Sequence, residues 1–585
     1  MSNKMPTESQ KLAIESSGRT ILKSCPGSGK TFVVASKMIS EMNKWEYKNK
    51  GIALLSFTNV AHEEVIRQIK VLSGINKIDY PHYTGTLDSF ISQFLFLPFG
   101  HLIMKCKEHP VLLQDYSVMI NDLANKRWKN ECHVNMCNLL DFYIDESDSV
   151  KHIKGERICN ITNKKPCEIL KNSLYSKGLA TYQDAIVIAL KILKGYPKIG
   201  RLLAQKFPMI IIDEAQDTSK YQMEIIDLLS AYGVKDILLI GDPDQAIYEW
   251  RNADPSVFLN KFNSSEWKNE ELNDNFRCSQ KICNATKVFS TLTKISKSAG
   301  ETALSTFQPQ VVLYDKSNKQ SVIDYFLDLC KKNNIVITNE NVAILVRGKA
   351  GLFGKDYSQI QNLWQSQETK FFSEACYERD YKSVKRALEL VEKGLYILFI
   401  DSKPIYTNIY EKEMIISSII LVDIWRKMVV DFCRNMPNAD MELKLWKNEL
   451  NKLILIISEK YNIQIRSTAE IKIKTRDNNY KDFQQQPIKN FYAVSVANEY
   501  LNSTIHAVKG RTFEGVLLLI QSNGKLTSNM INTKPIESEE IRTAYVAMTR
   551  AKQLLVVAIP NTIKKKSLIR FPITEWNLID LHKKL

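Results

Sequence analysis

The feature that most constrains the fold is a short glycine-rich stretch, Pro26-Gly27-Ser28-Gly29-Lys30-Thr31, which follows an apolar segment and precedes a predicted helix. Glycines at a strand-to-helix turn let backbone N–H groups surround phosphate oxygens. In such a loop Lys30 can neutralise the outer phosphate oxygens, and the hydroxyl of Thr31 can ligate Mg²⁺. Ser24 stands where the GxxxxGK[ST] pattern has its first glycine. The stretch still predicts a nucleotide-binding α/β domain built on a parallel sheet.

A pair of acids strengthens this prediction. The apolar run Ile210–Ile212 leads directly into Asp213 and Glu214. A buried strand delivers the residues that follow it to the carboxyl edge of a sheet, where Asp213 can bind Mg²⁺ through water and Glu214 can polarise an attacking water. Two acids after a strand are common alone, but together with a phosphate-binding loop they predict hydrolysis of a nucleoside triphosphate. Thr31 and Asp213 are the predicted metal ligands.

Apolar periodicity predicts two parallel α/β regions, each interrupted by mainly helical sequence. In the first region we expect strands at residues 20–22, 52–57, 208–212 and 236–240, and helices at 31–42, 60–72 and 221–231. In the second we expect strands at 342–346, 516–520 and 554–558 and a helix at 541–549. Residues 476–486 are the best candidate for an exposed loop.

This pattern predicts a division into domains. The first parallel-sheet domain is expected at residues 1–97 and 191–272, with an inserted helical domain at 98–190. The second parallel-sheet domain is expected at 273–350 and 491–585, with an inserted helical domain at 351–490.

Length and charge agree with several folded domains and a polyanionic partner. At 585 residues the chain exceeds what one core usually organises. Lys and Arg outnumber Asp and Glu by 80 to 64, a formal charge of +16, which favours nucleic acid, with a basic surface for solubility as the alternative. No apolar run approaches the roughly 20 residues that cross a bilayer, and residues 1–10 are polar, so we expect a cytoplasmic protein without a membrane partner.

The cysteines are expected to be reduced thiols, because eleven of them, an odd number, are scattered along a long chain. Five potential zinc ligands lie within one stretch, namely Cys132, His133, Cys137, Cys159 and Cys167. Their spacing lacks the gaps of about two to four residues that ordinary zinc sites have on both sides. We therefore do not predict zinc there, and a bound metal ion is the alternative.

Further motifs accompany the loop and the acid pair in a fixed order. Asp213-Glu214-Ala215-Gln216-Asp217 looks like motif II of the UvrD/Rep/PcrA-type helicases of superfamily 1A. Gln10 resembles the Q motif of that family, and residues 241–251 (GDPDQAIYEWR) resemble its motif III. The other matches are 56–61 (SFTNVA), 85–90 (GTLDSF), 275–277 (NFR), 504–510 (TIHAVKG) and 545–552 (YVAMTRAK). The resemblance covers almost the whole chain.

This resemblance implies two RecA-like motor domains, each with a mainly helical insertion, that close on ATP and Mg²⁺. By it, Gln10 reads the adenine, the ring of Phe276 stacks on the adenine, and Gln245 senses the γ-phosphate. Arg277 and Arg550, from the second motor domain, stabilise charge on the transferring phosphoryl group. These residues complete the predicted ATP site around the phosphate loop and the acid pair.

The resemblance also implies contacts to single-stranded or tailed duplex DNA. Aromatic residues in such sites stack on bases without reading their sequence, worth about 1 to 3 kcal/mol per base. Taken alone, Tyr248 is better explained by core packing, whereas Trp250, followed by Arg251, is better explained by base stacking. The implied nucleic-acid residues are Phe57, Thr58, Asn59, Thr86, Tyr248, Trp250, Arg251, His506 and Lys509.

Three positions depart from the family pattern. Thr512 replaces the acid of KGLEF, with Glu514 two positions later, so neither residue is carried over as the nucleotide-sugar contact. Asp88 stands where the GTFHSF segment has histidine, which weakens any phosphate contact there. With Ser24, these changes leave the ATPase core intact and place the chain away from the housekeeping members of the family.

The implied activity is ATP-driven 3′→5′ translocation on single-stranded DNA, in phage defence or DNA repair. A DNA-stimulated ATPase that serves a partner nuclease stays open, because size and motif style resemble the helicase-like subunits of Gabija-type anti-phage systems and no nuclease motif is present here. A nucleotide-gated nucleic-acid-binding module is a third hypothesis, against which the complete acids and both arginines argue. RNA as substrate also stays open.

Overall fold

The computed structural model describes residues 5–113, 141–153, 165–247, 253–348, 364, 366–400, 415–466, 484–492, 500–520, 534–562 and 568–581. The chain forms two compact units. Unit 1 comprises Met1–Leu112, Lys126–Leu352 and Glu499–Leu585, and unit 2 comprises Leu113–Asn125 and Phe353–Asn498. Among the described residues, none of the helices combines the length and the apolar composition that crossing a membrane requires.

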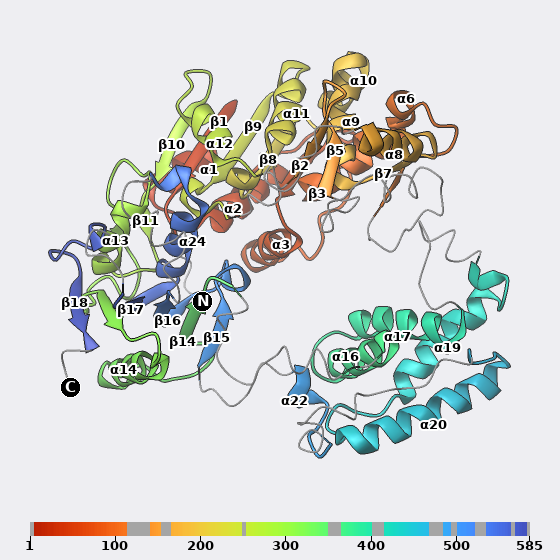
Figure 1. Ribbon diagram of the computed structural model, residues 1–585. Helices are drawn as coiled ribbons and strands as arrows, with labels where there is room; N and C mark the ends of the chain where they lie inside the picture. The colour runs from red at the N-terminus through yellow and green to blue at the C-terminus, as the bar shows by residue number, and fades with distance from the viewer. Residues whose placement is uncertain are drawn as a thin grey trace. The chain divides into compact units, whose positions relative to one another are not determined.

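Six strands form the sheet of the first lobe, which is the part of unit 1 before residue 273 (Figure 1). Their order is β10-β1-β9-β8-β2-β3, and all neighbouring strands are parallel. Because the strands are parallel, the residues that follow them lie at one common edge. The strands are β1 (Arg19–Ser24), β2 (Ile52–Ser56), β3 (Tyr83–Thr86), β8 (Met209–Ile212), β9 (Asp236–Gly241) and β10 (Lys268–Leu272).

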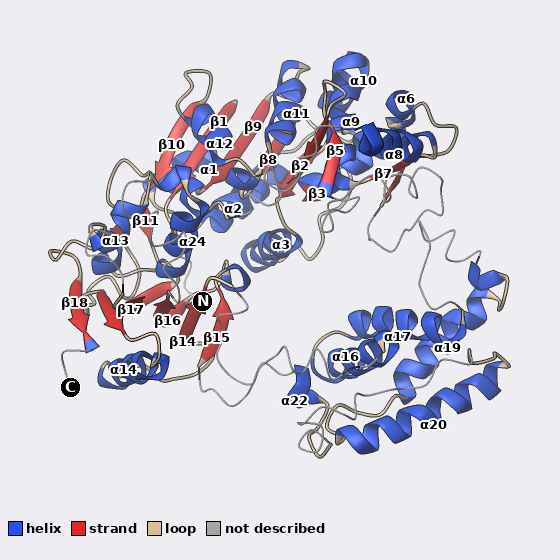
Figure 2. Ribbon diagram, in the orientation of Figure 1, coloured by secondary structure: helices blue, strands red, loops and turns tan. Residues whose placement is uncertain are grey.

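Helices cover both faces of this sheet (Figure 2), as the buried faces of a parallel sheet require. Leu54 and Ile211 pack in one cluster with α2 and α3. Ala53 and Ile210, one residue earlier on each strand, pack on the opposite face with α9 and α11. The first-lobe helices outside the β3–β8 connection are α1 (Glu8–Glu15), α2 (Lys30–Asn43), α3 (Asn59–Ser73), α11 (Lys220–Ala231) and α12 (Pro255–Phe262).

The connection between β3 and β8 is mainly helical, with short strand pairs that the sequence did not indicate. Its helix α9 begins at a capping box in which Thr181 and Asp184 bond each other's backbone. Because α9 packs on the first-lobe sheet, the predicted domain boundary at residue 190 falls inside a helix of the lobe core. Its elements are α4 (Leu87–Ile91), η1 (Ser92–Phe96), α5 (Leu97–Phe99), α6 (His101–Met104), β4 (Val111–Leu112), β5 (Phe142–Ile144), β6 (Val150–His152), α8 (Lys165–Ser176), β7 (Leu179–Ala180), α9 (Tyr182–Gly195) and α10 (Pro197–Lys206).

The second lobe of unit 1, from residue 273 onward, also contains a six-stranded parallel sheet. Six parallel strands take the order β15-β14-β16-β17-β13-β18. The core lies between this sheet and α13 and α24. A short parallel pair, β11 (Asp274–Asn275) and β12 (Lys297–Ser298), precedes this sheet. The main elements are β13 (Gln310–Tyr314), β14 (Val342–Val346), β15 (Leu501–Thr504), β16 (Phe513–Leu519), β17 (Ala551–Pro560), β18 (Asn577–Asp580), α13 (Gln280–Thr286), α14 (Lys319–Lys332) and α24 (Glu539–Met548).

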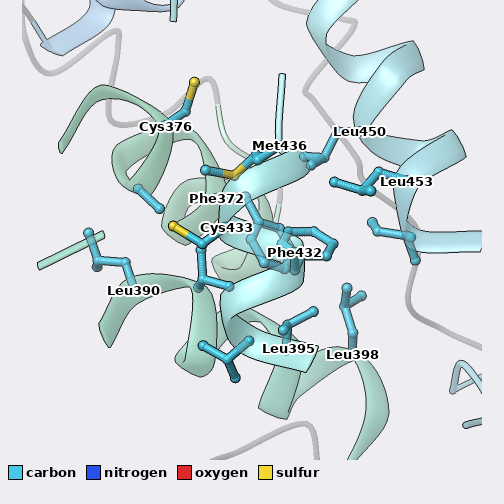
Figure 3. Packing of buried hydrophobic residues seen from close by; sticks show 14 of the residues in the cluster. Phe372, Cys376, Leu390, Leu395, Leu398, Phe432, Cys433, Met436, Leu450 and Leu453 are labelled. Carbon is cyan, nitrogen blue, oxygen red and sulfur yellow. The ribbon is translucent and has the colours of Figure 1, made fainter. Parts of the chain in front are cut away.

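Unit 2 is helical in its described residues. Its core gathers the facing sides of the helices around Phe372, Leu395, Phe432 and Leu450 (Figure 3). The larger helices are α16 (Gln367–Tyr381), α17 (Val384–Phe399), α19 (Val422–Asn435) and α20 (Leu443–Tyr461). Residues 476–483 of the predicted exposed loop lie outside the described residues.

Most predicted strands and helices are confirmed, with bounds shifted by a few residues. The strand predicted at 342–346 is β14, with the same bounds. The strand predicted at 516–520 begins earlier, at Phe513, and the one at 554–558 extends to Ala551–Pro560. The sequence analysis missed β10, because this edge strand reads Lys-Asn-Glu-Glu-Leu and carries no apolar pattern.

Candidate functional site

The phosphate loop lies between β1 and α2, at the carboxyl edge of the first-lobe sheet. Gly27 and Gly29 have φ of 71° and 78°, a backbone conformation that favours glycine. A Cβ at Gly27 would lie 2.6 Å from the Cβ of Arg277, and one at Gly29 would lie 2.9 Å from Nε2 of Gln10. The two glycines are therefore required both for the turn and for the close approach of other elements.

Ser24 ends β1, and its hydroxyl donates a hydrogen bond to the carbonyl of Gly241 at 3.0 Å. The serine in place of the first glycine therefore anchors the start of the loop to β9. The hydroxyl of Ser28 is buried and has no hydrogen-bond partner among the described residues. Since a buried donor without a partner costs about 1–3 kcal/mol, a free hydroxyl in this loop fits an anionic ligand such as a phosphate.

The acid pair follows β8 as predicted. Asp213 is 2% exposed, and its N–H donates to the carbonyl of Leu55 on β2 at 2.8 Å. Glu214 has a left-handed backbone, with φ of 55°, which turns its carboxylate toward the phosphate loop. Lys30 Nζ lies 3.4 Å from Glu214 Oε2, and Gln216 Nε2 donates to the same oxygen at 2.5 Å. The predicted lysine and acid therefore meet at one site.

Burial and nearby charges shift the pKa values of the two acids in opposite directions. Burial, and then the neighbouring Glu214 carboxylate, raise the pKa of Asp213 to about 7. Burial would also raise the pKa of Glu214, but the ammonium groups of Lys30 and Lys509 outweigh it and lower that pKa to about 2. Without a metal ion the pair therefore carries one secure negative charge, on Glu214, near neutral pH.

Gln245 and Arg550 meet across the two lobes. Gln245 Nε2 donates to Oδ2 of Asp242 at 2.5 Å, and Nη2 of Arg550 donates to Oε1 of Gln245 at 2.7 Å. Arg277 Nη1 donates to the carbonyl of Thr549, the residue before Arg550, at 3.2 Å. Burial, and then the charge of Arg277, lower the pKa of Arg550 to about 9. The buried guanidinium of Arg550 and the half-buried one of Arg277 form a site that an anion would stabilise.

Gln10 and Phe276 both touch the phosphate loop. Gln10 Nε2 donates to the carbonyl of Ser28 at 2.9 Å, and its Oε1 accepts from the N–H of Thr7 at 3.1 Å. The N–H of Phe276 donates to the carbonyl of Gly27 at 2.9 Å. Both residues therefore lie beside the loop, and their adenine contacts stay predictions.

The sequence analysis missed a second interlobe contact. Lys509 Nζ, from the second lobe, lies 2.7 Å from Oδ2 of Asp217, whose side chain is 1% exposed. Gln216 Nε2 also donates to Asp217 at 3.0 Å, so Gln216 links this ion pair to Glu214. Lys509, predicted to contact nucleic acid, is therefore tied to the acids of the ATP site. Asp217 belongs to the same short motif as Asp213, but nothing in the sequence relates that motif to Lys509.

Arg542 is another interlobe residue that the sequence analysis missed. It is fully buried in α24 of the second lobe, and its Nε donates to the carbonyl of Ala246 on the first lobe at 2.6 Å. The signal that could have found it is a charge within an otherwise apolar stretch of helix. Arg542 and Arg550 of the second lobe therefore bind two adjacent first-lobe residues, Ala246 and Gln245.

The predicted nucleic-acid residues are only partly placed. Phe57, Thr58 and Asn59 follow β2 and Thr86 ends β3, so they share the sheet edge that carries the phosphate loop. The hydroxyls of Thr58 and Thr86 cap α3 and α4. Nε2 of His506 lies 3.2 Å from the carbonyl of Ile247. Tyr248, Trp250 and Arg251 lie outside the described residues.

Two further sequence features have structural counterparts. Asp88, which replaces the family histidine, accepts a hydrogen bond from Nε2 of Gln222 at 2.6 Å and so ties α4 to α11. Cys167 is buried on α8, while Cys132, His133, Cys137 and Cys159 lie outside the described residues. Among the described residues, no cluster of three or more His, Cys, Asp or Glu could hold a metal ion, and the five-residue group stays untested.

The residues present fit ATP and Mg²⁺. The loop offers backbone N–H groups at the start of α2, a lysine, and the free Ser28 hydroxyl. Thr31 follows Lys30 at the start of α2, and Asp213 directly follows β8, and both carry oxygen atoms of the kind that ligate a divalent ion. The two arginines from the second lobe supply positive charge on the opposite side.

Comparison with known proteins agrees with this geometry. Residues 6–266 match the family model described as UvrD/REP helicase N-terminal domain, and residues 431–562 match the UvrD-like helicase C-terminal domain. The chain is 23% identical to Gabija protein GajB of Bacillus cereus (strain VD045), over 94% of this chain and 95% of that protein. It is 24% identical to the ATP-dependent DNA helicase Rep of Buchnera aphidicola subsp. Schizaphis graminum, over 93% and 92%. It is 20% identical to the ATP-dependent DNA helicase PcrA of Staphylococcus epidermidis, over 95% and 83%.

Proposed function

Since the chain belongs to the UvrD-like family of ATP-dependent DNA helicases, we propose that it is an ATP-driven motor that moves 3′→5′ along single-stranded DNA. The observation that supports this most directly is the meeting of both lobes at the phosphate loop. Lys30 and Glu214 come from the first lobe, Arg550 comes from the second, and Gln245 bonds Arg550 across the boundary. A nucleotide bound there would contact both lobes at once.

Each of these residues has a role that its position supports. Lys30 and the loop N–H groups bind the β- and γ-phosphates, and Glu214, which its low pKa keeps ionised, orients and polarises the attacking water. Arg277 and Arg550 stabilise negative charge that develops on the γ-phosphoryl oxygens. Mg²⁺, when bound by Thr31 and Asp213, neutralises charge between the β- and γ-phosphates.

Hydrolysis would then be coupled to motion by loss of the charge that draws the lobes together. Arg550 is a buried cation and Arg277 is a half-buried one, and the triphosphate would be their anionic partner from the first lobe. Once the γ-phosphate has left, this attraction is weaker and the lobes separate. Single-stranded DNA at the strand edge, near Phe57–Asn59 and Thr86, would be shifted by each cycle of closing and opening.

The test is ATP turnover with and without single-stranded DNA, followed by unwinding of duplexes with a 3′ or a 5′ tail. We expect DNA to stimulate turnover, unwinding only of the 3′-tailed duplex, and no turnover in Lys30→Ala. Lys44→Ala is the matched control, because Lys44 is exposed just after the other end of the same helix. Wild-type turnover in Lys30→Ala would contradict the site, and unwinding only from a 5′ tail would contradict the direction.

A second function is favoured by one comparison, the near full-length match to Gabija protein GajB. In this case the chain is the DNA-stimulated ATPase subunit of a phage-defence complex, and cutting belongs to a partner nuclease chain. DNA-stimulated turnover without unwinding of either duplex would favour this function over the autonomous motor. Substituting single-stranded RNA in the turnover assay tests the nucleic-acid preference, and we expect DNA to stimulate more strongly.

A further inference from the structure

A buried polar cluster joins the two lobes at a place separate from the arginines. The first lobe contributes Lys23 on β1, Glu271 on β10 and Asp244 on the turn after β9. The second lobe contributes the segment Ser290–Thr293, which follows α13. These residues are called the interlobe cluster below. Asp244 belongs to the stretch 241–251 that resembles motif III, but the resemblance gave no role to Asp244 or to the other members of the cluster.

Asp244 holds the second-lobe segment by three hydrogen bonds. Its Oδ2 accepts from Oγ of Ser290 at 2.9 Å, from the N–H of Thr291 at 2.8 Å and from Oγ1 of Thr291 at 3.1 Å. Asp244 is completely buried. One carboxyl oxygen therefore binds two adjacent residues of the second lobe at once.

Lys23 and Glu271 hold the same segment from the other side. Lys23 Nζ lies 2.6 Å from Glu271 Oε1 on the neighbouring strand, and the two side chains are 4% and 13% exposed. Lys23 Nζ also donates to the carbonyl of Thr291 at 3.3 Å, and Thr293 Oγ1 donates to Glu271 Oε2 at 2.6 Å. Asp244 therefore accepts hydrogen bonds from the N–H and the hydroxyl of Thr291, and Lys23 donates one to its carbonyl.

The cluster is directly connected to both elements that face the γ-phosphate. Lys23 lies on β1, one residue before Ser24 and the phosphate loop. Asp244 is followed in the chain by Gln245, which bonds Arg550, and its own N–H donates to Asp242 at 3.1 Å. A displacement of the Ser290–Thr293 segment is therefore transmitted through Asp244 to the turn that carries Gln245.

Asp244 is incompletely satisfied in this geometry. Its second oxygen, Oδ1, is buried and has no hydrogen-bond partner among the described residues. Burial of a carboxylate acceptor without a donor is costly, so a small rearrangement of the segment that brings a donor to Oδ1 would be favourable.

We propose that Asp244 is a positioning residue of the motor, which couples movement of the second-lobe segment Ser290–Thr293 to the placement of Gln245 at the γ-phosphate. This inference rests on the proposed function. It assigns to Asp244 no contact with ATP or DNA. Its effect is on how well closure of the lobes places the groups that act on the phosphate.

The test compares Asp244→Asn, Ser290→Ala and Thr291→Val with the wild-type chain in steady-state ATP turnover. Asparagine keeps the shape and loses the charge, and valine keeps the shape of threonine and loses its hydroxyl. We expect kcat with DNA to fall about tenfold in Asp244→Asn and KM for ATP to change less than about twofold. The stimulation by DNA should fall with kcat. Ser176→Ala is the control, since Ser176 is exposed and its hydroxyl donates to the carbonyl of Ser173 in its own helix.

The double variant Asp244→Asn/Thr291→Val separates positioning from a merely structural role. If both residues act through their shared contact, its kcat equals that of the single Asp244→Asn variant, whereas independent effects would multiply. A lower melting temperature with wild-type kcat and DNA stimulation in these variants overturns the proposal and leaves the proposed function standing. If Asp244→Asn does not fold, Thr291→Val decides in the same way. A wild-type chain without ATP turnover overturns both.

Discussion

Nη2 of Arg550 in the second lobe donates a hydrogen bond of 2.7 Å to Oε1 of Gln245 in the first lobe. Arg550 is 1% exposed, and its other hydrogen bonds go to the carbonyls of Val546 and Arg511. Its acceptors among the described residues are neutral oxygens. A buried guanidinium bonded only to neutral groups is poised for an anion, and Gln245 holds it where a γ-phosphate would lie.

Arg550→Lys should therefore impair turnover more than nucleotide binding. Lysine keeps the charge but lacks the planar fork that bonds Gln245 and Val546 together. We expect kcat to fall by about 10³, as for loss of an arginine that acts on a phosphoryl group, with a much smaller change in KM for ATP. Arg386→Lys, at an exposed ion pair of unit 2, is the control. A kcat within about threefold of wild type would contradict the role of Arg550.

The ion pair of Lys509 and Asp217 leads to a stability prediction. Asp217 is 1% exposed and Lys509 is 13% exposed, with 2.7 Å between Nζ and Oδ2. Lys509→Met leaves a buried carboxylate unpaired and should lower the free energy of unfolding by about 3 kcal/mol. Asp217→Asn should cost less, because the lysine is near the surface and can reach water.

The double variant Lys509→Met/Asp217→Asn should be more stable than Lys509→Met alone, because no unpaired charge is left buried. Urea unfolding of the four chains, including wild type, measures the coupling. Strictly additive losses would show that the two side chains do not interact in solution.

The sequence predicted which residues gather at the phosphate loop, because they follow apolar strands and occur in short, ordered motifs. Lys30, Asp213 and Glu214 were found from local pattern alone, and the structure brings them together. The lobe cores were found because buried parallel strands such as β14 read as continuous apolar runs. The edge strand β10 was missed because a strand with exposed, charged residues has no such pattern.

The contacts between lobes could not be predicted from the sequence. Lys509 and Asp217 are 292 residues apart, and Asp244 and Thr291 are 47 apart, with no periodicity that relates them. A lysine in a motif that resembles a nucleic-acid segment gives no sign that its partner is a buried acid. The ion-pair partner of each charged residue is visible only in the folded structure.

The raised pKa of Asp213 predicts how the Mg²⁺ requirement varies with pH. Burial raises the pKa of this carboxyl to about 7, so below pH 7 the neutral form dominates in the metal-free site. A carboxyl must lose its proton to bind a divalent ion, so each pH unit below 7 should weaken Mg²⁺ binding by about tenfold. The free Mg²⁺ that gives half-maximal turnover, measured at fixed Mg·ATP, should therefore rise from pH 8 to pH 6. An unchanged requirement over that range would contradict a protonated Asp213.

The pair of Lys171 and Asp184 supports α9, the helix that joins the β3–β8 connection to the first-lobe core. Both side chains are fully buried, and Lys171 Nζ lies 2.6 Å from Asp184 Oδ2. Asp184 also accepts from the hydroxyl of Tyr175 at 2.8 Å and from Thr181 in the capping box of α9. Asp184→Asn leaves a buried ammonium without its counter-charge, so we expect a loss of about 3–5 kcal/mol in the free energy of unfolding.

Lys191→Met is the matched control, because Lys191 pairs with Asp148 at the same distance, 2.6 Å, but the carboxylate is 83% exposed. A surface pair of this kind contributes about 0–1 kcal/mol, so the control should unfold at nearly the wild-type urea concentration. Replacing both buried partners, in Lys171→Met/Asp184→Asn, should recover part of the loss because no unpaired charge remains. If Asp184→Asn cost no more than Lys191→Met, the buried pair would not be what holds α9 against the lobe.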